Sequence, residues 1–186
     1  MATWRTLLDT DALHAHEAWT RRGYSGDGRV DLEDTRLDGL RASGALLMRA
    51  RLSRCSLIRA ELRLADLTEA ELFTCVLDQS RLEGVVMEHG LLDHCSLVGA
   101  ALLTSRLRHT EVRGGSFRGA LLQRSWLQHS HWVEVDLRDA DMEDVDLTGA
   151  HLERCDLRGV QLSEAQMAQA TLVDCVQGPP EAAPGR

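Results

Sequence analysis

The sequence predicts an all-β solenoid, in which the chain winds into stacked coils with flat sides five residues long. Apolar residues, large at every position except Ala42, recur at every fifth position from Leu32 to Leu172, which makes 29 consecutive positions without a shift in register. An amphipathic helix would repeat every 3.6 residues and a half-buried strand every two, so neither explains this period. The residue two positions before each large one is small in nearly every unit, and Pro179, Pro180 and Pro184, the three prolines, all lie beyond the repeat. Two positions in five therefore point inward, and backbone groups pair between coils without interruption by proline.

A helix is expected before the first coil, in residues 9–23, whose sequence is DTDALHAHEAWTRRG. Asp9, Thr10 or Asp11 could cap its N-terminus, and Gly23 ends it after two arginines in the last turn. An apolar stripe at helical spacing is expected to cover the open end of the first coil. The stripe consists of Leu8, Ala12, Ala15 and Trp19, and Trp4 is expected nearby.

Several five-residue units contain a small residue, an aspartate and a large apolar residue in that order. Units of this kind include Ala65-Asp66-Leu67, Ala140-Asp141-Met142, Val145-Asp146-Leu147 and Cys155-Asp156-Leu157. They resemble the pentapeptide repeat family, whose units read roughly A(D/N)LXX. The resemblance covers residues 30–176 and implies a right-handed quadrilateral parallel β-helix with four pentapeptides in each coil. A repeat region of this length makes about seven coils, and helical N-terminal caps recur in the family.

The predicted organisation has three parts. A helical cap and a turn occupy residues 1–29, the β-helix occupies residues 30–176, and a disordered tail occupies residues 177–186. The last coil would expose Leu172 and its neighbours. Two remedies stay open: a second copy could bind through the C-terminal coil to form a homodimer, or a few ordered residues could fold over the end.

Five cysteines are separated by multiples of twenty residues, and they are Cys55, Cys75, Cys95, Cys155 and Cys175. With twenty residues in each coil, they fall in one column on an inner corner. Neighbouring coils lie about 4.8 Å apart, a spacing that a disulfide could bridge, but we interpret these residues as small members of the core. No CxxC pair suggests a metal site. The same spacing places Trp132 next to Val112, a smaller residue that makes room for the indole.

The composition excludes several classes of function. The net charge is −8 and all 21 basic residues are arginine, so direct nucleic-acid binding and chemistry that needs a lysine are not expected. No apolar run reaches the roughly 18 residues of a membrane span, and the start has no signal-peptide pattern, so a cytoplasmic protein is expected. A filled coil with flat sides has no concave site, so we predict neither catalysis nor a cofactor.

Histidines line up on the outside of the predicted coils. His89, His109 and His129 share one column, and His131 and His151 share another. A metal cluster near His129 and His131 is geometrically possible, but no acid or thiolate is clearly placed to complete it. The sequence therefore predicts no metal site.

Acidic residues gather in the last third of the repeat. Residues 30–130 hold 13 acids and 13 arginines, whereas residues 131–176 hold 11 acids and three arginines, a net charge of −8. The candidate partner-binding surface consists of Glu134, Asp136, Asp139, Asp141, Glu143, Asp144, Asp146, Glu153, Asp156 and Glu164. Asp136 would stack on Asp156, and Asp144 on Glu164, at a cost in stability that a positively charged partner could offset.

A second interpretation applies to part of this surface. The positions of Asp136, Asp141, Asp146 and Asp156 are those where the family has Asp or Asn, so these four could serve only to bond backbone groups. Asp139, Glu143, Asp144, Glu153 and Glu164 lie at other positions, and they carry the functional argument.

The resemblance implies a protein that binds another protein. Some pentapeptide repeat proteins resemble B-form DNA in width and charge, bind DNA gyrase or topoisomerase IV, and protect against quinolones or toxins. Competition for a basic, DNA-binding saddle is therefore the first hypothesis. This chain departs from that subgroup because its first coils are charge-balanced and it has neither projecting loops nor an obvious C-terminal helical dimerisation module. Arginines close together in those coils are Arg49, Arg51, Arg54, Arg59 and Arg63.

The alternative hypothesis is a scaffold for an unrelated protein partner. Apolar residues at outward positions favour it, because they could form a contact patch. They are Phe73, Leu91, Leu103, Leu121, Trp126 and Val133.

Overall fold

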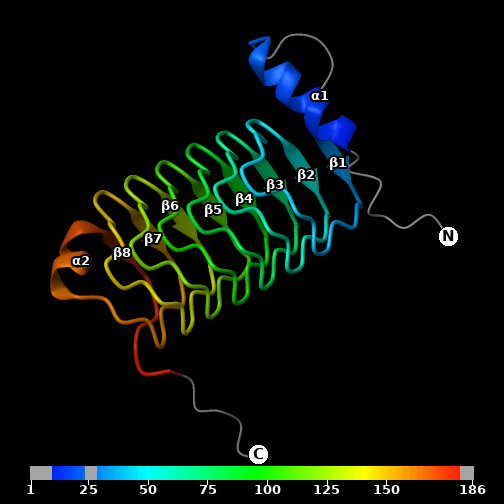
Figure 1. Ribbon diagram of the computed structural model, residues 1–186. Helices are drawn as coiled ribbons and strands as arrows, with labels where there is room; N and C mark the ends of the chain where they lie inside the picture. The colour runs from blue at the N-terminus through cyan, green and yellow to red at the C-terminus, as the bar shows by residue number, and fades with distance from the viewer. Residues whose placement is uncertain (1–9, 24–28, 181–186) are drawn as a thin grey trace, which may run out of the picture.

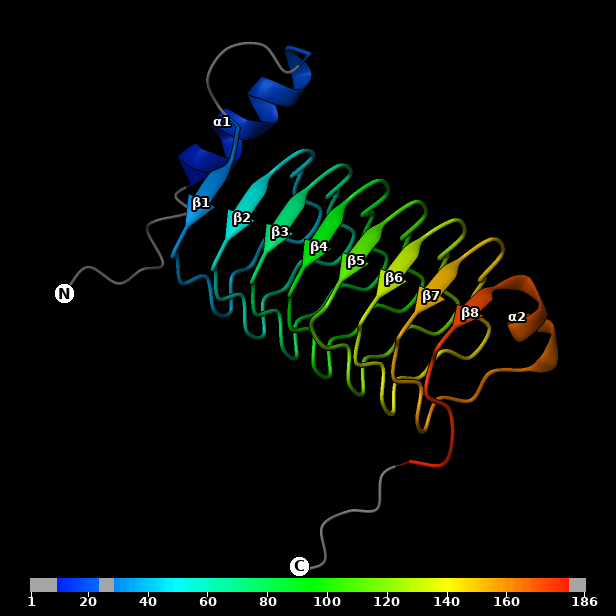
Figure 2. The same ribbon diagram turned by 180° about the vertical axis from the view of Figure 1, so that it is seen from behind.

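Coils of the chain stack into a rod in the computed structural model, which describes residues 10–23 and 29–180 (Figures 1 and 2). One side of the rod is a parallel sheet of eight strands, ordered β1 to β8 along the chain. The strands are β1 Asp31–Glu33, β2 Arg51–Ser53, β3 Glu71–Phe73, β4 Leu91–Asp93, β5 Glu111–Arg113, β6 His131–Val133, β7 His151–Glu153 and β8 Thr171–Val173. Residues twenty apart are paired in every case, beginning with Leu32 and Leu52.

The other three sides of each coil are held by single parallel bridges with the same spacing. The first bridges of the three columns join Arg36 to Ser56, Arg41 to Glu61, and Leu46 to Asp66. Four sides per coil and a register of twenty residues confirm the predicted parallel β-solenoid.

Leucines fill the interior, as the five-residue period predicts. Leu52, Leu82 and Leu122 are at most 5% exposed, and the cavity inside the first coils measures only about 20 Å³. The predicted contact between Val112 and Trp132 is confirmed by their pairing across β5 and β6. Trp132 has a second neighbour that the repeat pattern does not reveal: the edge of Phe117 packs on the indole with ring centres 4.8 Å apart.

The cysteine column lies inside the rod. Cys55, Cys75, Cys95 and Cys155 are buried and Cys175, in the last coil, is half-buried. Each Sγ donates to a backbone carbonyl of the coil before it, as Cys155 does to Trp132 at 3.4 Å. Burial raises the pKa of the Cys155 thiol to about 11, so the thiol stays protonated at neutral pH.

Each corner of the coil contains a residue in the left-handed conformation, two positions after the large inward residue. Glycine occupies only some of these corners; Leu64 (φ 56°) and Arg124 (φ 57°) are examples with side chains. A side chain in this conformation costs roughly 1–2 kcal/mol. The regular hydrogen bonds between coils compensate that cost, because the corner N–H donates to the next coil at every corner from Asp34 to Asp139, as Leu64 does to Glu83 at 3.0 Å.

Helix α1, Thr10–Arg21, forms at the predicted place, and Gly23 follows it with φ 70°. It lies beside β1 at the N-terminal end of the rod (Figure 1). Thr10 and Asp11 belong to the helix, and the side chains predicted to cap it lie outside the described residues. Leu8, Trp4, the cap candidate Asp9 and the side chain of Ala12 lie outside the described residues.

The predicted buried face of α1 is wrong at Ala15, which is exposed. His16, fully buried, and Trp19, 7% exposed, face inward instead. The reason is a hydrogen bond to Val30. Ala50 occupies the position of Val30 in the next coil, and its backbone N–H donates to the carbonyl of Leu47, three residues earlier. At Val30, His16 Nδ1 accepts the equivalent proton at 2.8 Å, so the helix turns its histidine toward the first coil.

The prediction of unbroken coil sides up to residue 176 is wrong for Glu164–Gln169, which form helix α2. Ala165 is exposed and Met167 is 37% exposed, so neither enters the core. The predicted stacking of Glu164 on Asp144 is therefore wrong as well. Ser163 and Gln166 explain the helix, because they form a capping box at its start.

The chain returns to the coil in β8 and in the bridge between Asp156 and Val176. Leu162 and Leu172 are only partly buried at this end of the rod. Residues 181–186 of the predicted tail lie outside the described residues. Association with a second copy through this end stays a prediction.

Candidate protein-binding groove

Helix α2 leaves the rod where a coil side was expected, and the space below it is a groove of about 880 Å³. Five carboxylates line this groove, together with Gln166 and Gln169 of α2. They belong to Asp139, Asp141, Glu143, Asp144 and Asp146. Of the described residues that line it, none is basic. The expectation that every side of the rod is flat is wrong here, because the five-residue period continues through a segment that folds as a helix.

Asp141 and Asp146 build the turns of the groove. Asp141 accepts the backbone N–H of Glu143 at 3.1 Å, and Asp146 accepts that of Thr148 at 3.0 Å. Side-chain amides of the preceding coil, from Gln123 and Gln128, donate to the second oxygen of each aspartate. The interpretation that these aspartates bond to backbone groups is confirmed.

Asp139, Glu143 and Asp144 present their charge to solvent. Asp139 lies 3.6 Å from Arg118, and Asp144 lies 3.7 Å from Arg124 in a pair whose side chains are 68% and 75% exposed. Pairs this exposed are worth less than about 1 kcal/mol, so a partner can replace them. Glu143 is exposed and has no ion pair among the described residues.

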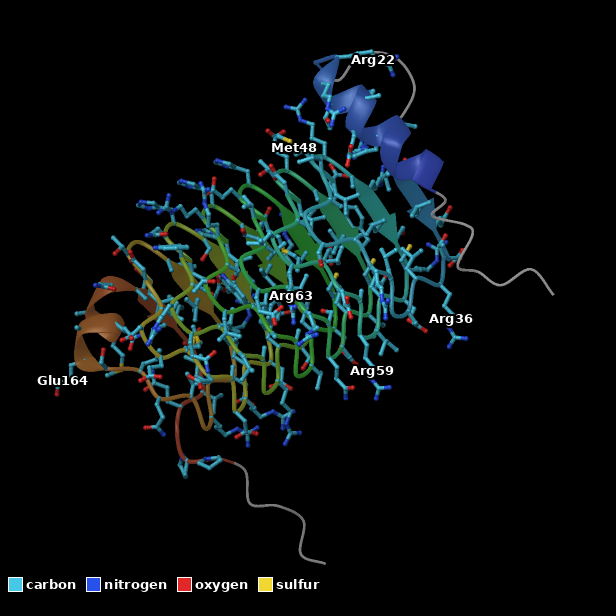
Figure 3. All side chains as sticks on the ribbon, in the orientation of Figure 1. Arg22, Arg36, Met48, Arg59, Arg63 and Glu164 are labelled. Carbon is cyan, nitrogen blue, oxygen red and sulfur yellow. The ribbon has the colours of Figure 1, made fainter. Side chains whose placement is uncertain are left out.

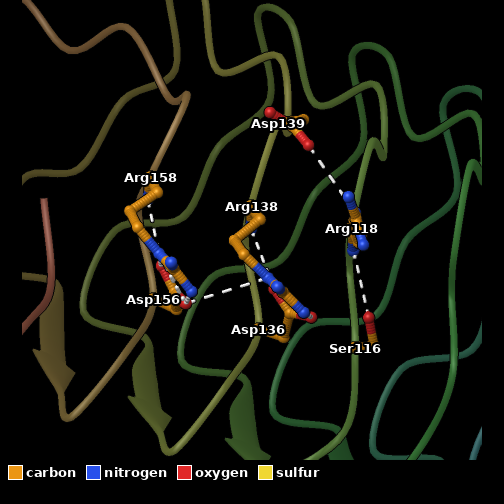
Figure 4. A network of polar contacts seen from close by, with 7 residues as sticks. All are labelled: Ser116, Arg118, Asp136, Arg138, Asp139, Asp156 and Arg158. Atoms are coloured by element: carbon orange, nitrogen blue, oxygen red, sulfur yellow. Dashed lines mark hydrogen bonds and ion pairs between the residues drawn. The ribbon is translucent and has the colours of Figure 1, made fainter. Parts of the chain in front are cut away.

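Asp136 and Asp156 are not among the residues that line the groove, and Figure 4 shows them beside Arg138 and Arg158. The predicted repulsion between them is compensated within the chain, since Arg138 lies 2.8 Å from Asp136 and 3.8 Å from Asp156. Arg158 pairs with Asp156 at 2.6 Å. Both aspartates also accept a backbone N–H two residues later. No external cation is needed to offset their charge.

The remaining acids are scattered. Glu134 lies 3.0 Å from Arg154, which also contacts Glu153. Glu164 projects from α2 away from the rod (Figure 3). The ten predicted site residues thus divide into five in the groove, four paired with arginines elsewhere, and Glu164 on α2.

The paired and turn-building aspartates make stability sensitive to acid. Arg138 lowers the pKa of Asp136, the Thr148 hydroxyl that of Asp146, and Arg158 that of Asp156. A carboxyl whose pKa is lower in the folded state stabilises the protein above the unfolded value, about 3.9, and loses this contribution as the pH falls through the folded value. We therefore expect the melting temperature to fall steeply below about pH 4.

Circular dichroism melts from pH 7 to pH 2 test this expectation. Changing Asp136, Asp146 and Asp156 to asparagine should lower the melting temperature at pH 7. It should also flatten the acid limb, which is the fall of the melting temperature below about pH 4. Changing three acids that make no described hydrogen bond, namely Asp31, Glu143 and Asp174, to their amides should leave the limb steep. Equal acid limbs in the two variants would contradict the assignment.

The histidines stack rather than converge. The rings of His89 and His109 are 4.7 Å apart and nearly parallel, and His109 and His129 are 5.2 Å apart. His131 and His151 form a separate tilted pair at 4.9 Å. Within residues 10–23 and 29–180, no three His, Cys, Asp or Glu side chains are placed to hold a metal ion.

Of the six apolar residues predicted on the surface, Leu121 and Trp126 are exposed, and the other four are half-buried. The guanidinium of Arg108 lies 6.0 Å from the centre of the Trp126 ring. Sequence reasoning missed Leu64, which is 72% exposed. Its position at a corner, two residues after an inward leucine, was the available signal. In the described part of the chain, neither helix has the length and hydropathy of a membrane span.

Comparison with known proteins supplies the family. The model described as pentapeptide repeats matches eight copies, within residues 45–84, 116–154 and 140–176. No curated protein sequence matches the chain. Among solved structures, HetL of the cyanobacterium Nostoc sp. strain PCC 7120, involved in heterocyst differentiation regulation, is 18% identical, with 85% of this chain and 94% of HetL covered and a TM-score of 0.42.

QnrB1, a plasmid-mediated fluoroquinolone resistance protein, is 17% identical in a trypsin-treated form, with 79% of this chain and 82% of that chain covered and a TM-score of 0.46. A third structure, alr5209 from Nostoc, is 24% identical, with 57% and 84% covered and a TM-score of 0.45. The family match extends over more than half of the chain, and the register of twenty residues agrees with it. The chain belongs to the pentapeptide repeat family.

Proposed function

We propose that this protein acts by binding rather than by catalysis, and that its acidic C-terminal coils occupy a basic surface of a protein partner. The observation that carries this proposal is the gathering of five carboxylates in one groove. The groove lies in residues 131–176, whose net charge is −8. Charge of one sign gathered in a concave surface attracts a partner of opposite charge and guides its approach.

The groove suits binding better than chemistry. Asp141 and Asp146 already accept several hydrogen bonds each, so they are held as fixed acceptors at its floor. Glu143 and Asp144 are exposed at its rim, where arginine or lysine side chains of a partner could reach them.

The specific partner that we propose is a type II topoisomerase, either DNA gyrase or topoisomerase IV. The acidic coils would occupy the saddle that binds DNA and protect the enzyme from an antibiotic or toxin. The first coils would not take part, because most of their arginines are engaged by acids of the same chain: Arg49 pairs with Glu69 at 2.7 Å and Arg63 with Glu83 at 3.3 Å. The binding surface is thus confined to the C-terminal third of the rod.

A second candidate is a scaffold for an unrelated partner. The exposed Leu64 favours it, because burying such a side chain on a partner yields about 1.5–3 kcal/mol. Changing Leu64 to serine would weaken that complex, whereas it would leave a complex made through the acidic groove unchanged.

A supercoiling assay tests the topoisomerase proposal. Purified gyrase is assayed with a quinolone and increasing concentrations of the protein, and we expect recovery of supercoiling or inhibition of the enzyme at micromolar protein. Neither effect at that concentration, for gyrase and for topoisomerase IV, would rule out the specific partner. Binding to another basic protein would then favour the broader proposal.

A further inference from the structure

The segment that forms α2 keeps the sequence pattern of the coil. In residues 161–170 the large positions hold Leu162 and Met167, and the small positions hold Ala165 and Ala170. Stretches with this pattern form coil sides from Leu32 to Leu157, as their burial and bridges record. The pattern of residues 161–170 is therefore compatible with two structures, a helix and two further coil sides.

The contacts of Gln166 connect the two structures. In the earlier coils, the carbonyl at the position of Val145 accepts a backbone N–H 21 residues later, as Ser125 accepts that of Asp146 at 3.0 Å. In α2 the side-chain Nε2 of Gln166 takes this role and donates to Val145 O at 3.2 Å and to Met142 O at 2.9 Å. The backbone N–H of Gln166 meanwhile donates to Ser163 Oγ. The carbonyl of Val145 thus accepts a hydrogen bond from Gln166 in either structure: from its side chain in the helix, and from its backbone N–H in a coil.

We propose that residues 163–170 are a two-state segment. In the open state they form α2 and the acidic groove is accessible. In the closed state they form coil sides, Met167 enters the core beside Leu147, and the segment covers the groove. This inference adds to the proposed function a way to expose or cover the binding surface, and in that part it rests on the proposed function.

Two features hold the segment open. The closed state requires the left-handed conformation at Glu164 and Gln169, as at the equivalent corners Asp144 (φ 55°) and Gly149 (φ 68°). Such a conformation is less favourable for Glu and Gln than for Gly, and Glu69 (φ 57°) and Gln79 (φ 56°) adopt it in coils whose hydrogen bonds compensate the cost. Closing would also stack Glu164 on Asp144, and the two carboxylates would repel each other. Replacing both corner residues by glycine removes these obstacles and weakens the helix.

Oxidation of methionine by hydrogen peroxide measures the state, because the reaction follows exposure of the sulfur. Met87 and Met142 are 2% and 1% exposed and serve as internal controls, whereas Met167 is 37% exposed. In the unaltered protein, peptide mass spectrometry should find Met167 oxidised faster than either control. In the Glu164→Gly/Gln169→Gly variant, we expect the rate at Met167 to fall at least about tenfold.

The matched control is Arg124→Gly/His129→Gly. These two residues lie two coils before Glu164 and Gln169, at the equivalent corners, and both already have the left-handed conformation of a regular coil. This variant should leave the rate at Met167 unchanged. An unchanged or faster rate at Met167 in the Glu164→Gly/Gln169→Gly variant, with Met87 and Met142 still protected, would overturn the proposal. The readout needs no partner, so it stands apart from the proposed function. If Met167 in the Glu164→Gly/Gln169→Gly variant is oxidised slowly while partner binding is undiminished, the two-state segment is supported and the groove is refuted as the binding site.

Discussion

Replacing Trp132 with alanine is expected to destabilise the protein by about 3–5 kcal/mol, the range for removal of a large buried aromatic side chain. Trp132 is 1% exposed and is among the largest side chains of the core. Its ring packs on Phe117, and its Nε1 donates to Ser130 Oγ at 2.9 Å. Stacked coils cannot collapse into the space, because hydrogen bonds hold them at a fixed separation, so the cavity persists. The melting temperature should fall by about 10 °C.

Trp126 supplies the matched control, because it differs from Trp132 mainly in burial. Its side chain is 37% exposed, so the same change to alanine should cost less than about 1 kcal/mol. Urea unfolding followed by circular dichroism compares the two variants under one condition. Equal losses of stability would mean that the large inward positions do not form the core.

Reversing charge at the rim of the groove should weaken partner binding by about 100-fold, which corresponds to about 2.7 kcal/mol. The variant is Glu143→Arg/Asp144→Arg. Both side chains are exposed, neither bonds to the backbone through its carboxylate in the described residues, and the fold should stay intact. Each new arginine replaces attraction to a basic partner with repulsion. Titration calorimetry or the supercoiling assay measures the loss, and a melt verifies folding.

The control must change the net charge equally. Asp31→Arg/Asp174→Arg also reverses two exposed acids, but at sites outside the groove. It should reduce affinity by less than about tenfold at 0.15 M salt, where charges more than about 8 Å apart are largely screened. Equal losses in both variants would show that overall charge, and not the groove, directs binding.

The repeat region could be predicted from sequence because each five-residue unit has the same pattern of apolar and polar residues. Leu52, Leu72 and Leu92 face inward for the same reason, since every coil repeats the same division into inward and outward positions. The five-residue period, together with the four-sided coil that the family resemblance implies, predicted the spacing of twenty, the cysteine column and the contact of Trp132 with Val112. Local departures from the repeat were harder to predict, and the left-handed backbone at Gly115, outside the regular corner positions, is an example. At Gly115 (φ 82°), a Cβ atom would lie 2.1 Å from the carbonyl oxygen of Cys95.

The candidate site was predicted only in part. The charge count located the acids in the last third, but it could not separate Glu143, which is unpaired among the described residues, from Asp136, which Arg138 neutralises. The two residues lie on different sides of the coil, and only Asp136 is followed, two positions later, by an arginine that folds back onto it. Sequence position alone does not state such pairings.

The sequence by itself determined that this protein is a filled solenoid with a helical cap and acid at one end, because those features repeat or accumulate unit by unit. Only the tertiary structure decided the face of α1, the helix at Glu164–Gln169 and the groove below it. The physical reason is that these segments satisfy two local patterns equally well. Single long-range hydrogen bonds, from Val30 to His16 and from Gln166 to Met142 and Val145, accompany the choice between them.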